Sequence, residues 1–153
     1  MRSEKDVEAY LLKLNRRFTT VGDPLADGAP TPSGRPATFL VQSSDAMPPV
    51  ALRVEAPLVV LRVHIGDAPN VNGSEHGALF RKLLELNARS LVHASYGLED
   101  DRIVLSAALE LENLDFNELE ATLDEIDMAL AQQVPGLASI AGLAKKSGPA
   151  STK

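Results

Sequence analysis

Apolar residues recur at helical spacing in three stretches of the chain. These stretches cover residues 4–18, 75–90 and 116–134, and in each of them the large apolar side chains return every three or four positions. Such spacing places the apolar side chains on one face of a helix and the polar side chains on the other. The pattern therefore predicts three amphipathic helices.

Polar and turn-forming residues stand where these predicted helices should begin and end. Ser3 is followed by Asp6 before the first helix, and Asp115 is followed by Glu118 before the third. Both pairs have the spacing of a capping box, in which two side chains satisfy the first backbone donors of a helix. Pro135-Gly136 predicts the end of the third helix.

Apolar and polar residues alternate in five further stretches. The alternation predicts strands near residues 37–42, 50–56, 58–65, 92–98 and 102–111. The acidic turn at 99–101 joins the last two strands into a hairpin. We therefore expect an α+β fold, an antiparallel sheet of about five strands with helices packed on one face, in the order α-β-β-β-α-β-β-α.

The segments outside this pattern are rich in turn-forming residues. Residues 22–36 contain four Pro and three Gly and predict a loop, read as a solvated connector or alternatively as a recognition segment. Residues 144–153 predict a disordered tail. We accordingly expect one domain over residues 1–143.

Composition narrows the classes of chemistry. The chain of 153 residues is 44% apolar, which suits a single core, and it contains no cysteine, which excludes disulfides, thiol catalysis and thiolate metal sites. The charged N-terminus is unlike a signal peptide, and no run of about 18 apolar residues could span a bilayer. We expect a cytoplasmic protein.

The net charge of −6 is concentrated in the C-terminal third of the chain. No basic residue lies between Arg102 and Lys145, whereas acidic residues are frequent there. This surface would repel phosphate backbones, so nucleic acid is not an expected partner. The acidic helix is read as a solvated face, with a docking surface for a basic partner as the alternative.

Catalytic patterns are hard to find in the sequence. The histidines His64, His76 and His93 do not have the spacing of a metal-binding pair, and the glycines mark turns instead of a phosphate-binding loop. His93 beside Ser95 and Tyr96 is the one combination that resembles a base with a nucleophile. We expect no enzyme, no cofactor, no metal and no small-molecule substrate.

The helix at 75–90 carries more leucines than a single stripe requires. Exposing the surplus side chains in a monomer would favour association, because burying each Leu contributes about 1.5–3 kcal/mol. A symmetric homodimer is one interpretation, with this helix or the adjoining strand at 92–98 at its interface and Leu84 and Leu91 among the interface residues. A wide stripe that is buried within one domain is the other.

Three segments resemble known families. LLELN at 83–87, SYGLEDDRIVLSAALEL at 95–111 and LDFNELEATLDEI at 114–126 resemble the YbjN-like proteins and the CesT-type type III secretion chaperones. The resemblance implies the element order given above and a small, dimeric, non-catalytic protein. It also implies that a partner's extended segment binds across the first helix and the sheet, where Tyr10, Leu14 and Phe18 share the apolar stripe.

Two functions remain open after the resemblance is taken into account. The first is a chaperone-like module that holds an unfolded segment of another protein, such as an effector. The second is a sensory or stress-related regulatory module that binds a folded partner. The loop at 22–36 is longer than is usual in these chaperones, and Trp, frequent in their last helix, is missing.

Overall fold

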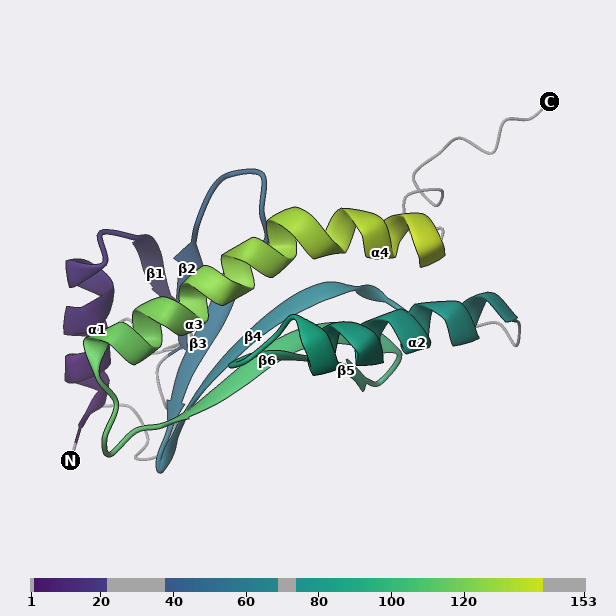
Figure 1. The fold of residues 1–153 in the computed structure, drawn as a ribbon. Helices are drawn as coiled ribbons and strands as arrows, with labels where there is room; N and C mark the ends of the chain where they lie inside the picture. Colours follow the sequence, from purple (N-terminus) through teal and green to yellow (C-terminus); the bar gives the residue numbers. More distant parts are fainter. Residues whose placement is uncertain (1, 22–37, 69–73, 142–153) are drawn as a thin grey trace. The chain divides into compact units, whose positions relative to one another are not determined.

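The computed structural model describes residues 2–21, 38–68 and 74–141 (Figure 1). Its elements, in chain order, are α1 (Glu4–Lys13), β1 (Arg17–Val21), β2 (Thr38–Gln42), β3 (Val50–Glu55), β4 (Leu58–Asp67), α2 (Ser74–Arg89), β5 (Ser95–Glu99), β6 (Arg102–Glu110), α3 (Phe116–Met128), the π-helical turn η1 (Ala129–Gln133) and α4 (Val134–Ala141). The predicted loop at 22–36 and the predicted tail at 144–153 lie outside the described residues.

Six strands form one sheet in the order β1-β2-β3-β4-β6-β5. The pairs β1–β2, β2–β3, β3–β4 and β5–β6 are antiparallel. The predicted α+β fold with an antiparallel sheet is confirmed. The number of strands is six and not about five, because β1 begins at residues 17 and 18, which the periodicity assigned to the first helix.

The first helix is shorter than its apolar stripe predicted. α1 ends at Lys13, and Asn15 then adopts a positive φ of 57°. Asparagine tolerates this left-handed conformation, which commonly ends a helix and redirects the chain. Phe18 consequently lies on β1 and not on α1.

The last helix is longer than predicted. Pro135-Gly136 does not end it, because η1 follows α3 and α4 continues from Val134. The backbone N–H of Val134 donates to the carbonyl of Ala129, five residues earlier. A wider turn of this kind accommodates the missing donor of Pro135, so the proline does not break the helix.

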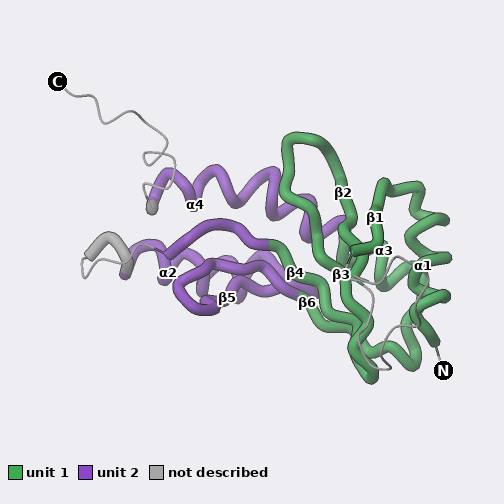
Figure 2. The backbone as a smooth tube through the Cα atoms, turned by 180° about the vertical axis from the view of Figure 1, so that it is seen from behind, with its two compact units in different colours: residues 1–63, 107–123 green, residues 64–106, 124–153 purple. Residues whose placement is uncertain are grey.

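The described chain divides into two compact units (Figure 2). Unit 1 comprises residues 1–63 and 107–123, and unit 2 comprises residues 64–106 and 124–153. Each unit therefore combines segments that are distant in sequence, and β4, β6 and α3 contribute residues to both. A single domain over residues 1–143 stays a prediction.

The core of unit 1 lies on one face of its strands. Alternate residues of β2, β3 and β4 are buried together with residues of α1 and α3, namely Val7, Leu11, Phe39, Val41, Val50, Leu52, Val54, Val59, Leu61, Val63, Leu119 and Leu123. The backbone N–H of Ser3 donates to Asp6 over 2.7 Å, and that of Glu118 donates to Asp115 over 2.7 Å. These contacts fix the starts of α1 and α3 as the sequence predicted.

The core of unit 2 is built from helices and the β5–β6 hairpin. Its buried apolar residues include Leu79, Leu83, Leu91, Tyr96, Ile103, Leu105, Ile126, Ala129, Leu130 and Leu137. The hairpin turns at Asp100 and Asp101, whose φ values of 47° and 64° match the tight turn that suits the twist of two antiparallel strands. No helix within the described residues is long and apolar enough to cross a membrane. A cytoplasmic location stays a prediction.

Candidate partner-binding surface

The register of β1 and β2 places four polar or half-buried side chains on the outer face of unit 1. Arg17 lies opposite Gln42, and Thr19 lies opposite Leu40. The intervening residue Phe18 lies opposite Val41, which is buried on the inner face. Because side chains alternate along a strand, the register separates an apolar inner face from a mixed outer face.

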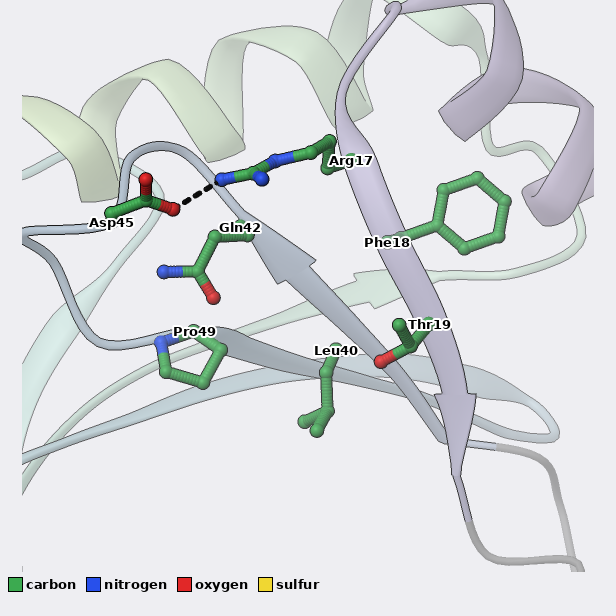
Figure 3. A pocket seen from close by; sticks show the side chains of 7 residues that line it. All are labelled: Arg17, Phe18, Thr19, Leu40, Gln42, Asp45 and Pro49. Carbon is green, nitrogen blue, oxygen red and sulfur yellow. Dashed lines mark hydrogen bonds and ion pairs between the residues drawn. The ribbon is translucent and has the colours of Figure 1, made fainter.

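A pocket of about 470 Å³ opens on this outer face (Figure 3). It is lined by Arg17, Phe18, Thr19, Leu40, Gln42, Asp45 and Pro49. In Figure 3 the ring of Phe18 points away from the side chains of Arg17 and Gln42, so Phe18 contributes mainly its backbone side to the pocket. All seven residues belong to unit 1.

The loop at 43–49 is held against the pocket by the ends of β1 and β2. The carboxamide nitrogen of Gln42 donates to the carbonyl of Ser44 over 2.6 Å and to that of Met47 over 2.8 Å. Arg17 forms an ion pair with Asp45 at 2.5 Å across the mouth of the pocket. The pocket is therefore shaped by the folded chain before any ligand arrives.

The pocket combines apolar and polar surface. Leu40 and Pro49 supply apolar surface, while the hydroxyl of Thr19 and the carboxamide oxygen of Gln42 supply polar atoms. The Arg17–Asp45 pair is largely exposed, and a pair of this kind contributes about 0–1 kcal/mol, so a ligand can displace it at little cost. Within the described residues, no group of three His, Asp or Glu side chains could hold a metal ion.

The predicted partner-binding residues all lie in unit 1, where each is half-buried. The hydroxyl of Tyr10 donates to the carbonyl of Leu114 over 3.3 Å, and its ring lies edge-on to Phe116. Leu14 caps the end of α1, and the ring of Phe18 lies edge-on to Phe39 with centroids 5.8 Å apart. Much of their apolar surface is thus used inside unit 1, and their role toward a partner stays a prediction.

Comparison with known proteins identifies the family of this chain. The family model CesT_Tir_1 matches residues 1–142. This chain belongs to the CesT_Tir_1 family. The resemblance inferred from residues 83–126 is thereby confirmed and extended to almost the whole sequence. No curated protein matches the chain.

Two solved structures share the fold of this CesT_Tir_1 family member. A chain of the heterodimeric ExoU–SpcU complex from the type III secretion system of Pseudomonas aeruginosa has a TM-score of 0.59 at 17% identity, covering 84% of this chain and 95% of that chain. The crystal structure of YbjN from E. coli, a proposed transcription regulator, has a TM-score of 0.51 at 13% identity, covering 93% of this chain and 90% of that chain. At these identities the likeness concerns the fold.

The two predicted dimer-interface residues of this CesT_Tir_1 family member lie in different environments within unit 2. Leu84 on α2 is 68% exposed, whereas Leu91 is only 9% exposed. Leu79 and Leu83 are buried, so most of the leucine-rich stripe packs inside unit 2. Leu84 therefore remains available to a second copy, and Leu91 offers little surface to one.

The residues weighed for catalysis take part in packing and backbone contacts. Tyr96 is buried, and its hydroxyl donates to the carboxamide oxygen of Gln133 over 2.7 Å. Burial raises the pKa of Tyr96 to about 12, so the hydroxyl is protonated at neutral pH. His93 is exposed, and its backbone N–H donates to Glu125 over 2.7 Å.

The sequence indicated Phe18 as a partner-binding residue, but it did not indicate Arg17 and Thr19 of β1 or the pocket residues of the loop at 43–49. Leu40 and Gln42 were assigned to a strand, but nothing in their spacing named Arg17, Asp45 or Pro49 as neighbours. The alternation of residues 37–42 could have separated the outer face from the inner one. The pairing of β1 with β2 cannot be read from it, because the periodicity assigns the start of β1 to the first helix and predicts no strand at 19–21.

Proposed function

We propose that this CesT_Tir_1 family member is a non-catalytic module that holds an extended segment of a partner protein on the outer face of unit 1. Family membership supports a chaperone-like role, and one solved relative by fold belongs to a type III secretion complex. The observation that carries the proposal is a preformed pocket beside the edge strand β1.

The backbone of β1 is available for pairing. β1 is the first strand in the sheet order, so one side of it has no neighbouring strand among the residues that the structure describes. Four of its five residues are exposed. An extended segment can add to such an edge through main-chain hydrogen bonds, which are independent of sequence.

The pocket provides the selectivity that main-chain pairing lacks. A side chain of the added segment that points to the outer face would contact Leu40 and Pro49. The nitrogen of Gln42 is occupied by two loop carbonyls, which leaves its oxygen to accept a hydrogen bond from the ligand. The pocket thus suits a long apolar side chain that ends in a donor, next to exposed Val21 on the same face.

Co-expression with the product of the adjacent gene in the native host tests the proposal. Leu40→Lys should weaken capture of that product by tenfold or more, because a charge would replace the apolar wall of the pocket. Leu12→Lys is the matched control, since Leu12 is 65% exposed on α1 and lies outside the pocket. Capture that is insensitive to Leu40→Lys but lost on Leu12→Lys would contradict the sheet-face proposal.

A regulatory module that binds a folded partner is the second candidate. The fold shared with YbjN, a proposed transcription regulator, favours it. An isolated peptide from the captured protein separates the two functions. Binding by the peptide alone supports the segment-holding role, whereas binding that requires the intact folded partner supports the regulatory role.

We further propose that the protein forms a homodimer through α2. Leu84 supports this proposal because a large apolar side chain is left in solvent, and its burial would contribute about 1.5–3 kcal/mol in each copy. Sedimentation equilibrium of the 16.3 kDa chain should show a species of twice that mass at micromolar concentration. Leu84→Glu should return it to a folded monomer, and a wild-type chain that is monomeric throughout would contradict the proposal.

A further inference from the structure

We infer that two side chains of this protein, Asn87 and Glu125, close the free edge of β5 so that a second copy of the chain cannot pair with it. β5 is the last strand in the sheet order. All residues in this inference belong to unit 2, and the closed edge does not depend on partner binding by unit 1.

Asn87 occupies the place of a neighbouring strand at Tyr96. The backbone N–H of Tyr96 donates to the Asn87 carboxamide oxygen over 2.7 Å, and the Asn87 carboxamide nitrogen donates to the Tyr96 carbonyl over 3.0 Å. A carboxamide offers the same donor and acceptor as a peptide group. The two bonds therefore reproduce those that an antiparallel partner residue would exchange with Tyr96.

The direction of these bonds shows which way the strand's backbone groups point. Tyr96 lies opposite Leu105 of β6, yet both of its polar backbone groups bond to α2. They consequently point to the outer edge of the sheet. Because outward-pointing groups alternate along a strand, those of Ala94 and Leu98 point to the same edge.

Glu125 closes the edge at Ala94. Its carboxylate accepts the backbone N–H of Ala94 over 2.9 Å, that of His93 over 2.7 Å and that of Val92 over 2.5 Å. Three adjacent donors that lead into β5 are thus satisfied by one side chain. A strand from a second copy would have to displace a charge-assisted set of bonds to reach them.

Only Leu98 remains as an outward position on β5. The turn follows this residue at once through Asp100 and Asp101. The acidic residues 99–101 would face the same residues of an antiparallel copy nearby, and like charges oppose such pairing. One free residue is too short a template for a stable strand pair.

Replacing Asn87 by Leu in the full chain tests the inference. The variant should associate beyond the state of the wild-type chain, and amide exchange at Leu98 should slow by about tenfold as concentration rises, which is the protection expected from one new hydrogen bond. Asn117→Leu is the matched control, because Asn117 is an exposed asparagine on α3 that belongs to unit 1, whereas β5 belongs to unit 2. It should keep the wild-type assembly.

A second substitution distinguishes association through strand pairing from association through the apolar side chain of the new leucine. Leu98→Pro removes the remaining outward donor, and combined with Asn87→Leu it should restore the wild-type assembly. Association that persists in the double variant would overturn the inference. A folded Asn87→Leu variant that keeps the wild-type assembly at every concentration would overturn it as well.

The wild-type chain and Glu125→Gln keep the inference testable if Asn87→Leu does not fold. In the wild-type chain, amide exchange at Leu98 should be independent of protein concentration, and slowing on concentration would overturn the inference. In folded Glu125→Gln, exchange at Ala94 should accelerate at low concentration and slow on concentration, and an unchanged rate at both would overturn it.

Discussion

The two edges of the sheet, β1 in unit 1 and β5 in unit 2, differ in what their backbones can do. Both strands carry mostly exposed side chains. The outward backbone groups of β5 are occupied at Ala94 and Tyr96 by Glu125 and Asn87, whereas β1 is the edge that we propose accepts a partner segment. Exposure of side chains is therefore a poor guide to whether an edge strand can accept a partner, and the backbone hydrogen bonds decide.

The contrast also bears on the proposed homodimer. The sequence left two candidates for its interface, the helix at 75–90 and the strand near 92–98. Closure of the β5 edge disfavours pairing of β5 strands, while the 68% exposure of Leu84 leaves α2 available.

The largest expected effect comes from removing the support beneath the open edge. Phe39 is buried on the inner face and its ring contacts Phe18 of β1. Phe39→Ala should lower the free energy of unfolding by about 3–5 kcal/mol, since it leaves a cavity beneath β1. Urea unfolding measures the loss. Leu40→Ala, on the half-buried outer face of the same strand, should cost clearly less, and equal losses would contradict the assignment of faces.

Acid should weaken the closed edge of β5 at Glu125. Burial alone would raise the pKa of Glu125, but the bonds from Val92, Ala94 and His93 together outweigh it and lower the pKa below its usual value. A lowered carboxyl pKa stabilises the folded state above the unfolded pKa of about 4.5, and this contribution is lost as the pH falls through the lower, folded value.

Glu125→Gln should therefore remove this acid sensitivity. At neutral pH the variant should lose about 1–2 kcal/mol of protection at the amides that follow α2, because a neutral acceptor replaces a charged one. Amide exchange at Ala94, followed from neutral pH into the acid range, measures both effects. Glu112→Gln, at an exposed position, should leave the profile unchanged. If the wild-type chain and Glu125→Gln showed the same dependence of Ala94 exchange on pH, Glu125 would not be the source of the acid sensitivity.

Alkali should act on unit 2 through Tyr96. Burial raises the pKa of Tyr96 from 10.0 to about 12, so its stabilising contribution is complete below pH 10 and is lost as the pH rises through about 12. Tyr96→Phe should cost about 1 kcal/mol at neutral pH by removing the bond to Gln133 and should flatten the alkaline slope. Thermal unfolding against pH tests this, with Tyr10→Phe in unit 1 as the control.

The smallest expected effect is a gain of stability in β5 itself. Gly97 lies in the strand with a normal backbone conformation, and an added Cβ would meet only Val104 at 3.9 Å. Gly97→Ala should raise the free energy of unfolding by about 0.4–1 kcal/mol, because the unfolded chain loses conformational freedom. Thermal unfolding would detect the gain, and a loss of stability would show that the position needs glycine.

The sequence by itself determined most elements and the sides on which they pack. Period-two alternation located the strands from β2 to β6, helical spacing located α2 and α3, and Ser3, Asp6, Asp115 and Glu118 marked the helix starts that the structure confirms. These signals are local, because they depend on which side chains meet solvent and on the first donors of a helix. The resemblance carried by residues 83–126 also named the family correctly.

Only the tertiary structure decided which strands form the two edges of the sheet and which side chains contact them. By polarity alone, Phe18 fits the apolar stripe of a helix and the apolar face of a strand equally well. Asn15 adopts a left-handed conformation after α1, and the chain therefore continues as β1 and not as helix. Asn87 and Glu125 read as ordinary polar residues of helices until the fold brings them to the backbone of β5. The pairing of Arg17 with Gln42 and the pocket beside them likewise depend on register. Register and long-range hydrogen bonds join residues that are distant in sequence, so a local pattern cannot encode them.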